Sequence, residues 1–240
     1  TLGITQGDEV LIPSLTFIAT ANAVAYTGAK PVFIDSEIDT WNIDPLQLEA
    51  AITPMTKAII PVHLYGQPVK MKMVMDLAHR HGLYVIEDAA EAHGAEVMGT
   101  KVGSIGDMGC FSFFGNKIIT TGEGGMLITN NKSFYDKAKI LRDHGMSPHK
   151  KYWHDQIGFN YRMTNIQAAI GCAQVEKIES ILEEKLRIAE TYKKYLSGLR
   201  SIILAPENEW SQNVFWMYAI ILDIQGKDNA QIREHVLGAL

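Results

Sequence analysis

The stretch that decides the fold is residues 58–86, AIIPVHLYGQPVKMKMVMDLAHRHGLYVI. Residues 58–64 form a continuous apolar run, which is typical of a strand covered on both faces. Residues 69–81 have the pattern of an amphipathic helix, and Gly82 follows as its C-cap. Residues 83–86 predict the next strand. A strand, a helix and a strand in this order indicate parallel strands joined by a right-handed crossover.

The chain on either side continues this alternation. Before it, the sequence predicts strands at 9–13 and 31–35 and helices at 17–26 and 45–52, the second capped by Asp44 and Pro45. After it, the sequence predicts strands at 108–114, 125–129 and 214–224 and helices at 133–144 (N-cap Ser133), 165–199 and 229–240. We therefore expect an α/β protein with a mostly parallel sheet flanked by helices.

A change of module is expected between residues 190 and 205. Residues 1–195 would form a large domain, and residues 196–240 the start of a small α+β C-terminal domain. The chain begins without Met and stops inside an expected helix, so we expect it to be a fragment of a longer protein.

The composition excludes several protein classes. The chain has 240 residues, a net charge of −5, 47% hydrophobic and 20% charged residues, which is ordinary for a globular protein and unlike a disordered one. The acidic balance argues against nucleic acid as a partner. No apolar run is long enough to span a membrane, and the first residues lack the features of a signal peptide. Cys110 and Cys172 lie in apolar surroundings, so we expect both to be buried in a protein of a reducing, cytoplasmic compartment.

Polar residues follow two of the predicted strands. Glu87–Gly94 follows one, and Ser112–Lys117 lies within and after another. In such folds ligands bind at the carboxyl ends of the strands, so an acid and a lysine can meet there. A pyridoxal phosphate enzyme needs this combination, because the lysine forms a Schiff base and the acid keeps the ring nitrogen protonated. A turn aspartate and a solvated lysine are the alternative interpretation.

Other chemistries find no matching motif in the sequence. The histidines lack the spacing of a metal site, and there is no nucleophile elbow, P-loop or dinucleotide-binding glycine pattern. The residues alone therefore lead to an α/β enzyme, with pyridoxal phosphate as a hypothesis.

Six runs in order along the chain carry a family resemblance. They are GDEVLIPSLTF (7–17), VHLYG (62–66), VIEDAA (85–90), FSFFGNK (111–117), TTGEGGM (120–126) and GFNYRMTN (158–165). With these runs the chain resembles the DegT-type sugar aminotransferases, which have the aspartate aminotransferase type I fold. Residues 113–121 and 152–155 are particularly similar to the subgroup of GDP-perosamine synthases.

The resemblance implies a role for each matching residue. Lys117 would bind pyridoxal phosphate as a Schiff base and, once released, carry the proton. Asp88 would pair with the ring nitrogen, Phe17 would stack on the ring and Ser112 would donate to the phosphate. Asn160 would reach the phosphate of a neighbouring subunit, which implies a homodimer with shared active sites.

Two departures from the family pattern stand out. Glu91 lies where many members have Gln, close to the cofactor's phenolic oxygen, so its carboxyl group would need a proton or a donor. The family's Gly-Thr/Ser-Ala phosphate loop would lie before residue 1.

The implied reaction moves an amino group from glutamate to a GDP-linked 4-keto-6-deoxy sugar and leaves 2-oxoglutarate. The implied setting is cytoplasmic polysaccharide biosynthesis, O-antigen included. Residues 149–154, HKKYWH, would either contact the sugar nucleotide or form a solvated loop. The alternatives are a UDP- or dTDP-linked 3- or 4-keto sugar as acceptor, a sugar dehydratase, a regulatory protein and a nicotinamide-dependent reductase. Lys117 argues against the dehydratases that use pyridoxamine phosphate, because they have His at that position.

Overall fold

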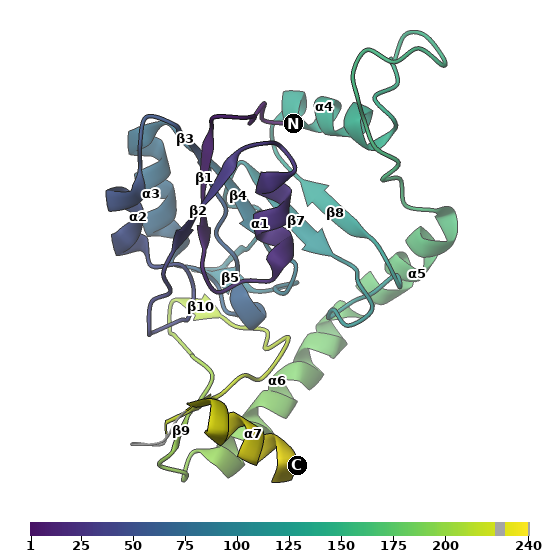
Figure 1. Ribbon diagram of the computed structural model, residues 1–240. Coiled ribbons are helices and arrows are strands. Elements are labelled where there is room, and N and C mark those ends of the chain that lie inside the picture. Colours follow the sequence, from purple (N-terminus) through teal and green to yellow (C-terminus); the bar gives the residue numbers. More distant parts are fainter. Residues whose placement is uncertain (224–228, 240) are drawn as a thin grey trace.

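The computed structural model describes residues 1–223 and 229–239 and is built around a six-stranded sheet (Figure 1). The strand order is β2-β1-β3-β4-β7-β8. The strands are β1 (Glu9–Pro13), β2 (Lys30–Ile34), β3 (Thr56–Ile59), β4 (Tyr84–Asp88), β7 (Met108–Ser112) and β8 (Gly125–Ile128). The first five of these in the sheet are parallel, and β8 runs antiparallel to β7. The predicted mostly parallel sheet is confirmed.

Helices cover both faces of this sheet. They are α1 (Ile18–Ala25), α2 (Pro45–Ala51) and α3 (Met71–His81). Alternate residues of β1 enter two different cores: Leu11 packs in the core that contains α2 and α3, whereas Val10 and Ile12 pack in the core that contains α1. Because successive side chains of a strand point to opposite faces, α1 lies across the sheet from α2 and α3.

The local signals for helix ends are mostly confirmed. The side chain of Asp44 accepts a hydrogen bond from the Leu46 N–H at the start of α2, and Gly82 ends α3 in the left-handed conformation, with a φ of 64°. The N-cap predicted at Ser133 is wrong by two residues. Asn131 caps α4 (Lys132–Arg142), because its side chain accepts hydrogen bonds from the backbone N–H groups of Ser133 and Phe134.

Two predicted elements are shorter than expected. The strand predicted at 58–64 ends at Ile59, and the chain turns through a short 3₁₀ helix at Leu64–Gly66. The single helix predicted at 165–199 is two helices, α5 (Asn165–Val175) and α6 (Ile178–Leu196). The break falls at Lys177, whose backbone is not helical, and no Gly or Pro marks it in the sequence.

The strand predicted at 214–224 is wrong for most of its length. Val214 and Trp216 lie outside any strand and are buried in the core beneath the sheet. The short strands are β5 (Glu96–Val97), β6 (Thr100–Lys101), β9 (Ile202–Ile203), β10 (Ser211–Gln212) and β11 (Ile221–Leu222). β10 pairs with β5, and β11 pairs with β9. Residue 224 lies outside the described residues.

The final helix is α7 (Asn229–Ala239), close to the prediction, with residue 240 outside the described part of the chain. The domain boundary after residue 195 stays a prediction, and residues 211–216 contact the sheet-bearing part.

The burial predicted for the cysteines is wrong for Cys172, which is exposed, and Cys110 is partly buried. Cys172 lies on α5, a helix with no fully buried residue. Among the described helices, none has an apolar stretch long enough to cross a membrane.

Candidate active site

A cavity of about 530 Å³ opens at the carboxyl ends of β4 and β7. This is where an open parallel sheet binds ligands. Its lining comes from the segment after β1, the turn after β3, the ends of β4 and β7, and a late segment that contains Trp216 and Met217. Five of the six predicted site residues line it: Phe17, Asp88, Glu91, Ser112 and Lys117.

Asp88 ends β4 with both carboxylate oxygens in hydrogen bonds. Oδ2 accepts from the hydroxyl of Thr20 at 2.9 Å, and Oδ1 accepts from the Ala90 N–H at 3.2 Å. Since the Thr20 hydroxyl has one hydrogen, the Thr16 hydroxyl donates to Thr20 in their 2.9 Å contact. This relay fixes the carboxylate in the cavity as an acceptor for a protonated ligand nitrogen.

Lys117 lies on the loop between β7 and β8, and its amine points into the same cavity. The Nζ atom is 3.7 Å from Oε1 of Glu91 and 3.8 Å from the centre of the Trp216 ring. The side chain is only 12% exposed. A lysine held inside a cavity is not the solvated lysine of the alternative interpretation.

The carboxyl group of Glu91 has the hydrogen-bond donor that its place near the cofactor requires. Its Oε2 accepts from the backbone N–H of Tyr65 at 2.8 Å, and Lys117 lies beside Oε1. Burial raises the pKa of Glu91 above its usual value, although the Tyr65 N–H and the Lys117 charge act in the opposite direction. Tyr65 presents this N–H from a left-handed conformation, with a φ of 55°.

Ser112 and Phe17 lie on the cavity wall with free binding groups. The Ser112 oxygen accepts a hydrogen bond from the Phe114 N–H, so the hydroxyl hydrogen remains available for a phosphate. Phe17 caps α1 and is 72% exposed, so its ring is available to cover a flat ligand.

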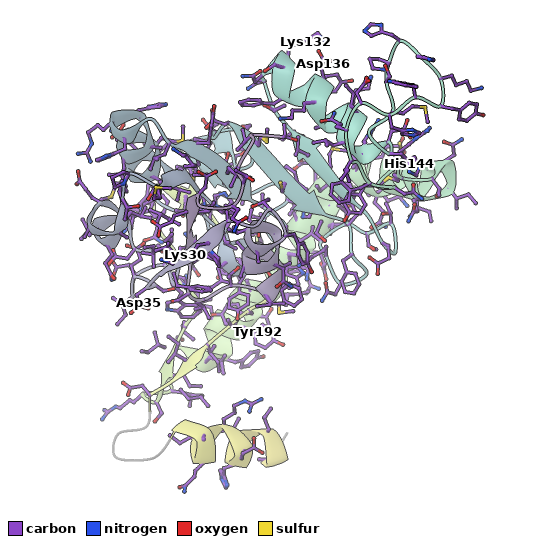
Figure 2. All side chains as sticks on the ribbon, turned by 45° about the horizontal axis from the view of Figure 1, so that its top comes forward. Lys30, Asp35, Lys132, Asp136, His144 and Tyr192 are labelled. Carbon is purple, nitrogen blue, oxygen red and sulfur yellow. The ribbon has the colours of Figure 1, made fainter. Side chains whose placement is uncertain are left out.

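Asn160 is not brought to this cavity. It is exposed on the loop of residues 146–164, which extends beyond α4 in Figure 1. Figure 2 labels His144, which lies between the end of α4 and this loop, and Lys132 and Asp136 at the start of α4. The role predicted for Asn160 concerns a neighbouring subunit and stays a prediction.

A fully buried, hydrogen-bonded pair, His63 and Glu87, supports the strand that carries Asp88. The Val69 N–H donates to Nδ1 of His63, so Nε2 carries the hydrogen that it shares with Glu87 at 3.1 Å. The backbone N–H groups of residues 103, 105 and 106 also donate to Glu87, at 2.7–2.8 Å. Burial would raise the pKa of Glu87, but the hydrogen bond from His63, with the Gly106 and Gly103 N–H groups, holds this pKa below its usual value. The pair is a rigid support directly behind Asp88.

Sequence reasoning missed three residues of the site, Thr20, Trp216 and Tyr65. Thr20 lies in a run of small residues that predicted only a helix, and its partner Asp88 is 68 positions away. Trp216 lies in an apolar run that predicted a strand. For Tyr65 a signal existed, since VHLYG was one of the family runs.

The residues present fit pyridoxal phosphate. One cavity combines an amine, a carboxylate fixed as an acceptor, a free hydroxyl and an exposed aromatic ring, which are the groups that this cofactor needs. Within the described residues, no group of three or more His, Cys, Asp or Glu side chains could hold a metal ion.

The sequence profile of the DegT/DnrJ/EryC1/StrS aminotransferase family matches residues 1–239. The chain belongs to this family. Among its relatives, the GDP-perosamine synthase of Caulobacter vibrioides is 51% identical over 98% of this chain and 63% of its own length. The GDP-perosamine synthase of Escherichia coli O157:H7 is 46% identical over 100% of this chain and 65% of its own. The chain thus spans less than two thirds of the length of these family members.

The same fold is found in a solved structure. DesV of S. venezuelae, determined with a ketimine intermediate, superposes with a TM-score of 0.91 at 36% identity, over 99% of this chain and 63% of that one. The predicted type I aminotransferase fold is confirmed, and membership of the family implies pyridoxal phosphate as the cofactor.

Proposed function

We propose that the protein is a pyridoxal phosphate-dependent aminotransferase that moves an amino group from glutamate to a GDP-linked 4-keto-6-deoxy sugar. The observation that carries this proposal is the presence of Lys117 and Asp88 in one cavity at the carboxyl ends of β7 and β4. The GDP-linked acceptor is supported by the names of the two relatives that are 51% and 46% identical.

Four side chains would hold the cofactor. Asp88 would accept from the ring nitrogen, Ser112 would donate to the phosphate, Phe17 would cover the ring and Lys117 would bind it covalently. When bound, pyridoxal phosphate supplies an electron sink that lets a carbon bearing nitrogen lose and regain a proton.

The chain's own part in the chemistry is to move that proton. The free amine of Lys117 takes the proton at Nζ and returns it, because it is the lysine that lines the cavity. Asp88 is held in place for the ring nitrogen, since Thr20 and Ala90 donate hydrogen bonds to its two oxygens. Glu91, held by the Tyr65 N–H, remains close enough to Lys117 to pair with its charged form.

The second substrate would be bound with help from another copy of this chain. The exposed loop of residues 146–164 carries Asn160 and a basic, aromatic run that includes Lys150, Lys151 and Trp153. This loop does not line the chain's own cavity, so in a homodimer it would reach the cavity of the partner and contact phosphate groups there. The dimer, the cytoplasmic location and a role in polysaccharide or O-antigen biosynthesis remain part of this proposal.

An absorbance experiment on the full-length protein tests the function. We expect a visible band with pyridoxal phosphate and its replacement by a near-ultraviolet band after glutamate is added. Keto sugars linked to GDP, UDP and dTDP are then added separately, and we expect the visible band to return fastest with the GDP-linked 4-keto sugar. A faster return of the visible band with a UDP- or dTDP-linked sugar would show that this sugar, and not the GDP-linked one, is the acceptor. If no band forms with pyridoxal phosphate, the proposed function fails and a regulatory protein becomes the favoured alternative.

A further inference from the structure

The amine of Lys117 has a second neighbour that the proposed function does not use. Trp216 places its ring face 3.8 Å from Nζ, measured to the ring centre, while Glu91 lies at 3.7 Å. The carboxylate is too far for a hydrogen bond. The ring face and the carboxylate therefore both lie beside the ammonium group, and the ring face makes the closer kind of contact that remains.

The position of Trp216 is fixed by hydrogen bonds from several parts of the chain. Its indole N–H donates to the carbonyl of Asn116, the residue before Lys117, at 2.7 Å. The ammonium group of Lys185 on α6 donates to the backbone carbonyl of Trp216 at 3.2 Å. The residue is 8% exposed and belongs to the main core. The ring is thus fastened to the same loop that carries the lysine.

The backbone conformation of the residues before Trp216 also fixes the position of this residue. Phe215 has a φ of 46°, a left-handed conformation that is uncommon for an aromatic residue, and its N–H donates to the side chain of Asn213 at 2.8 Å. The segment passes so close to Gly66 that a Cβ atom there would lie 2.9 Å from a methyl group of Val214 and 3.0 Å from the Phe215 nitrogen. A strained backbone in close contact at a binding cavity is expected where position matters for function.

We propose that Trp216 is a positioning residue for Lys117: after the amine is released from the cofactor and has taken up the proton, the ring face holds the resulting ammonium group next to Glu91 until the proton is returned. A cation over the face of an indole is stabilised by the ring's charge distribution, and the stabilisation is larger where water is excluded. The lysine therefore stays in the cavity between the two halves of the reaction. This inference rests on the role of Lys117 in the proposed function.

The test measures how fast an acetylating reagent labels individual lysines in the full-length protein without cofactor. Rates at Lys117 and Lys150 are followed by peptide mass spectrometry. In Trp216→Leu the amine loses both the shield and the group that stabilises its unreactive charged form, so we expect labelling of Lys117 to accelerate on the order of tenfold. Trp216→Phe keeps an aromatic face over the amine, so the labelling rate of Lys117 should stay close to that of the parent protein.

The matched control is Trp153→Leu. Lys150 lies over the Trp153 ring at 4.2 Å, the same kind of contact, but Trp153 is 54% exposed and lies outside the cavity. This variant should leave the labelling rate of Lys117 unchanged.

A second series separates the charge distribution of the ring from its bulk. Tryptophan with one, two, three or four fluorine atoms is incorporated at position 216, which weakens the attraction for a cation with little change in shape. The labelling rate of Lys117 should rise stepwise with each fluorine. A flat rate through the series, or no acceleration in Trp216→Leu, would overturn the proposal. If instead Lys117 fails to bind pyridoxal phosphate in the parent protein, the proposed function fails, while the labelling series still decides the role of Trp216.

Discussion

Two lysines of this chain lie over tryptophan rings, and their surroundings differ in almost every other respect. Lys117 is enclosed in a cavity with Trp216, Glu91 and Asp88, each held by hydrogen bonds to other segments. Lys150 lies over Trp153 on the exposed loop of residues 146–164. A lysine over a tryptophan ring is therefore not by itself evidence of function. The enclosed cavity and the hydrogen-bonded residues around Lys117 are what distinguish it from Lys150.

The largest effect should follow removal of the enclosed lysine. Lys117→Ala removes the amine that binds the cofactor and moves the proton, so the visible band should disappear and turnover should fall by at least about 10³-fold. Lys150→Ala should keep the band at full intensity. Absorbance and steady-state rates check both, and a Lys117→Ala protein with an unchanged spectrum would contradict the assignment of the site.

The support behind the cavity should matter most for stability. Glu87→Gln leaves a fully buried site with one acceptor fewer and an amide group facing N–H donors, so it should destabilise the fold by about 3 kcal/mol. Asp136→Asn is the comparison on the exposed side: it breaks the exposed pair with Lys132 on α4, labelled in Figure 2, and should cost less than about 0.5 kcal/mol. Urea unfolding measures both, and equal losses would show that the buried network is not a support.

The carboxylate at the ring nitrogen should affect rate rather than binding. Asp88→Asn keeps the shape of the side chain but loses its charge, so turnover should fall by roughly 10²-fold while the cofactor stays bound. Asp155→Asn, which changes the acceptor of the Trp153 indole N–H on the exposed loop, provides the control. Full activity in Asp88→Asn would remove Asp88 from the mechanism.

The smallest effect concerns Glu91 and pH. Because burial raises its pKa in the folded protein, the folded state retains a proton that the unfolded state has already released. Stability conferred at this position should therefore decline as pH rises from the unfolded pKa through the folded one. In the cofactor-free protein, the melting temperature of the parent relative to Glu91→Gln should fall between pH 4 and pH 7. A constant difference across this range would show that the carboxyl group has an ordinary pKa.

The sequence was informative where a local rule decides the structure. Asp44 and Gly82 marked the ends of helices, and the run at 58–86 implied parallel strands, because capping and hydrophobic alternation depend on neighbouring residues. It misplaced the cap at Ser133, since Asn131 is an equally good cap and makes two hydrogen bonds there. It missed the break at Lys177, because no Gly or Pro lies between the two helices.

The residues of the site also differ in how far the sequence could predict them. Family motifs pointed to Lys117 and Asp88, and strand ends placed them together. Trp216 could not be predicted, because its approach to Lys117 depends on contacts with Gly66, Asn116 and Lys185 that only the folded chain brings together.

The central claim is that the enclosed lysine, and not an exposed one, binds the cofactor. The most direct measurement treats the full-length protein with pyridoxal phosphate, reduces it with borohydride, and locates the added mass by peptide mass spectrometry. We expect one reduced cofactor per chain, on the peptide that contains Lys117 and absent from the peptide that contains Lys150. Modification spread over surface lysines, or missing from Lys117, would contradict the claim.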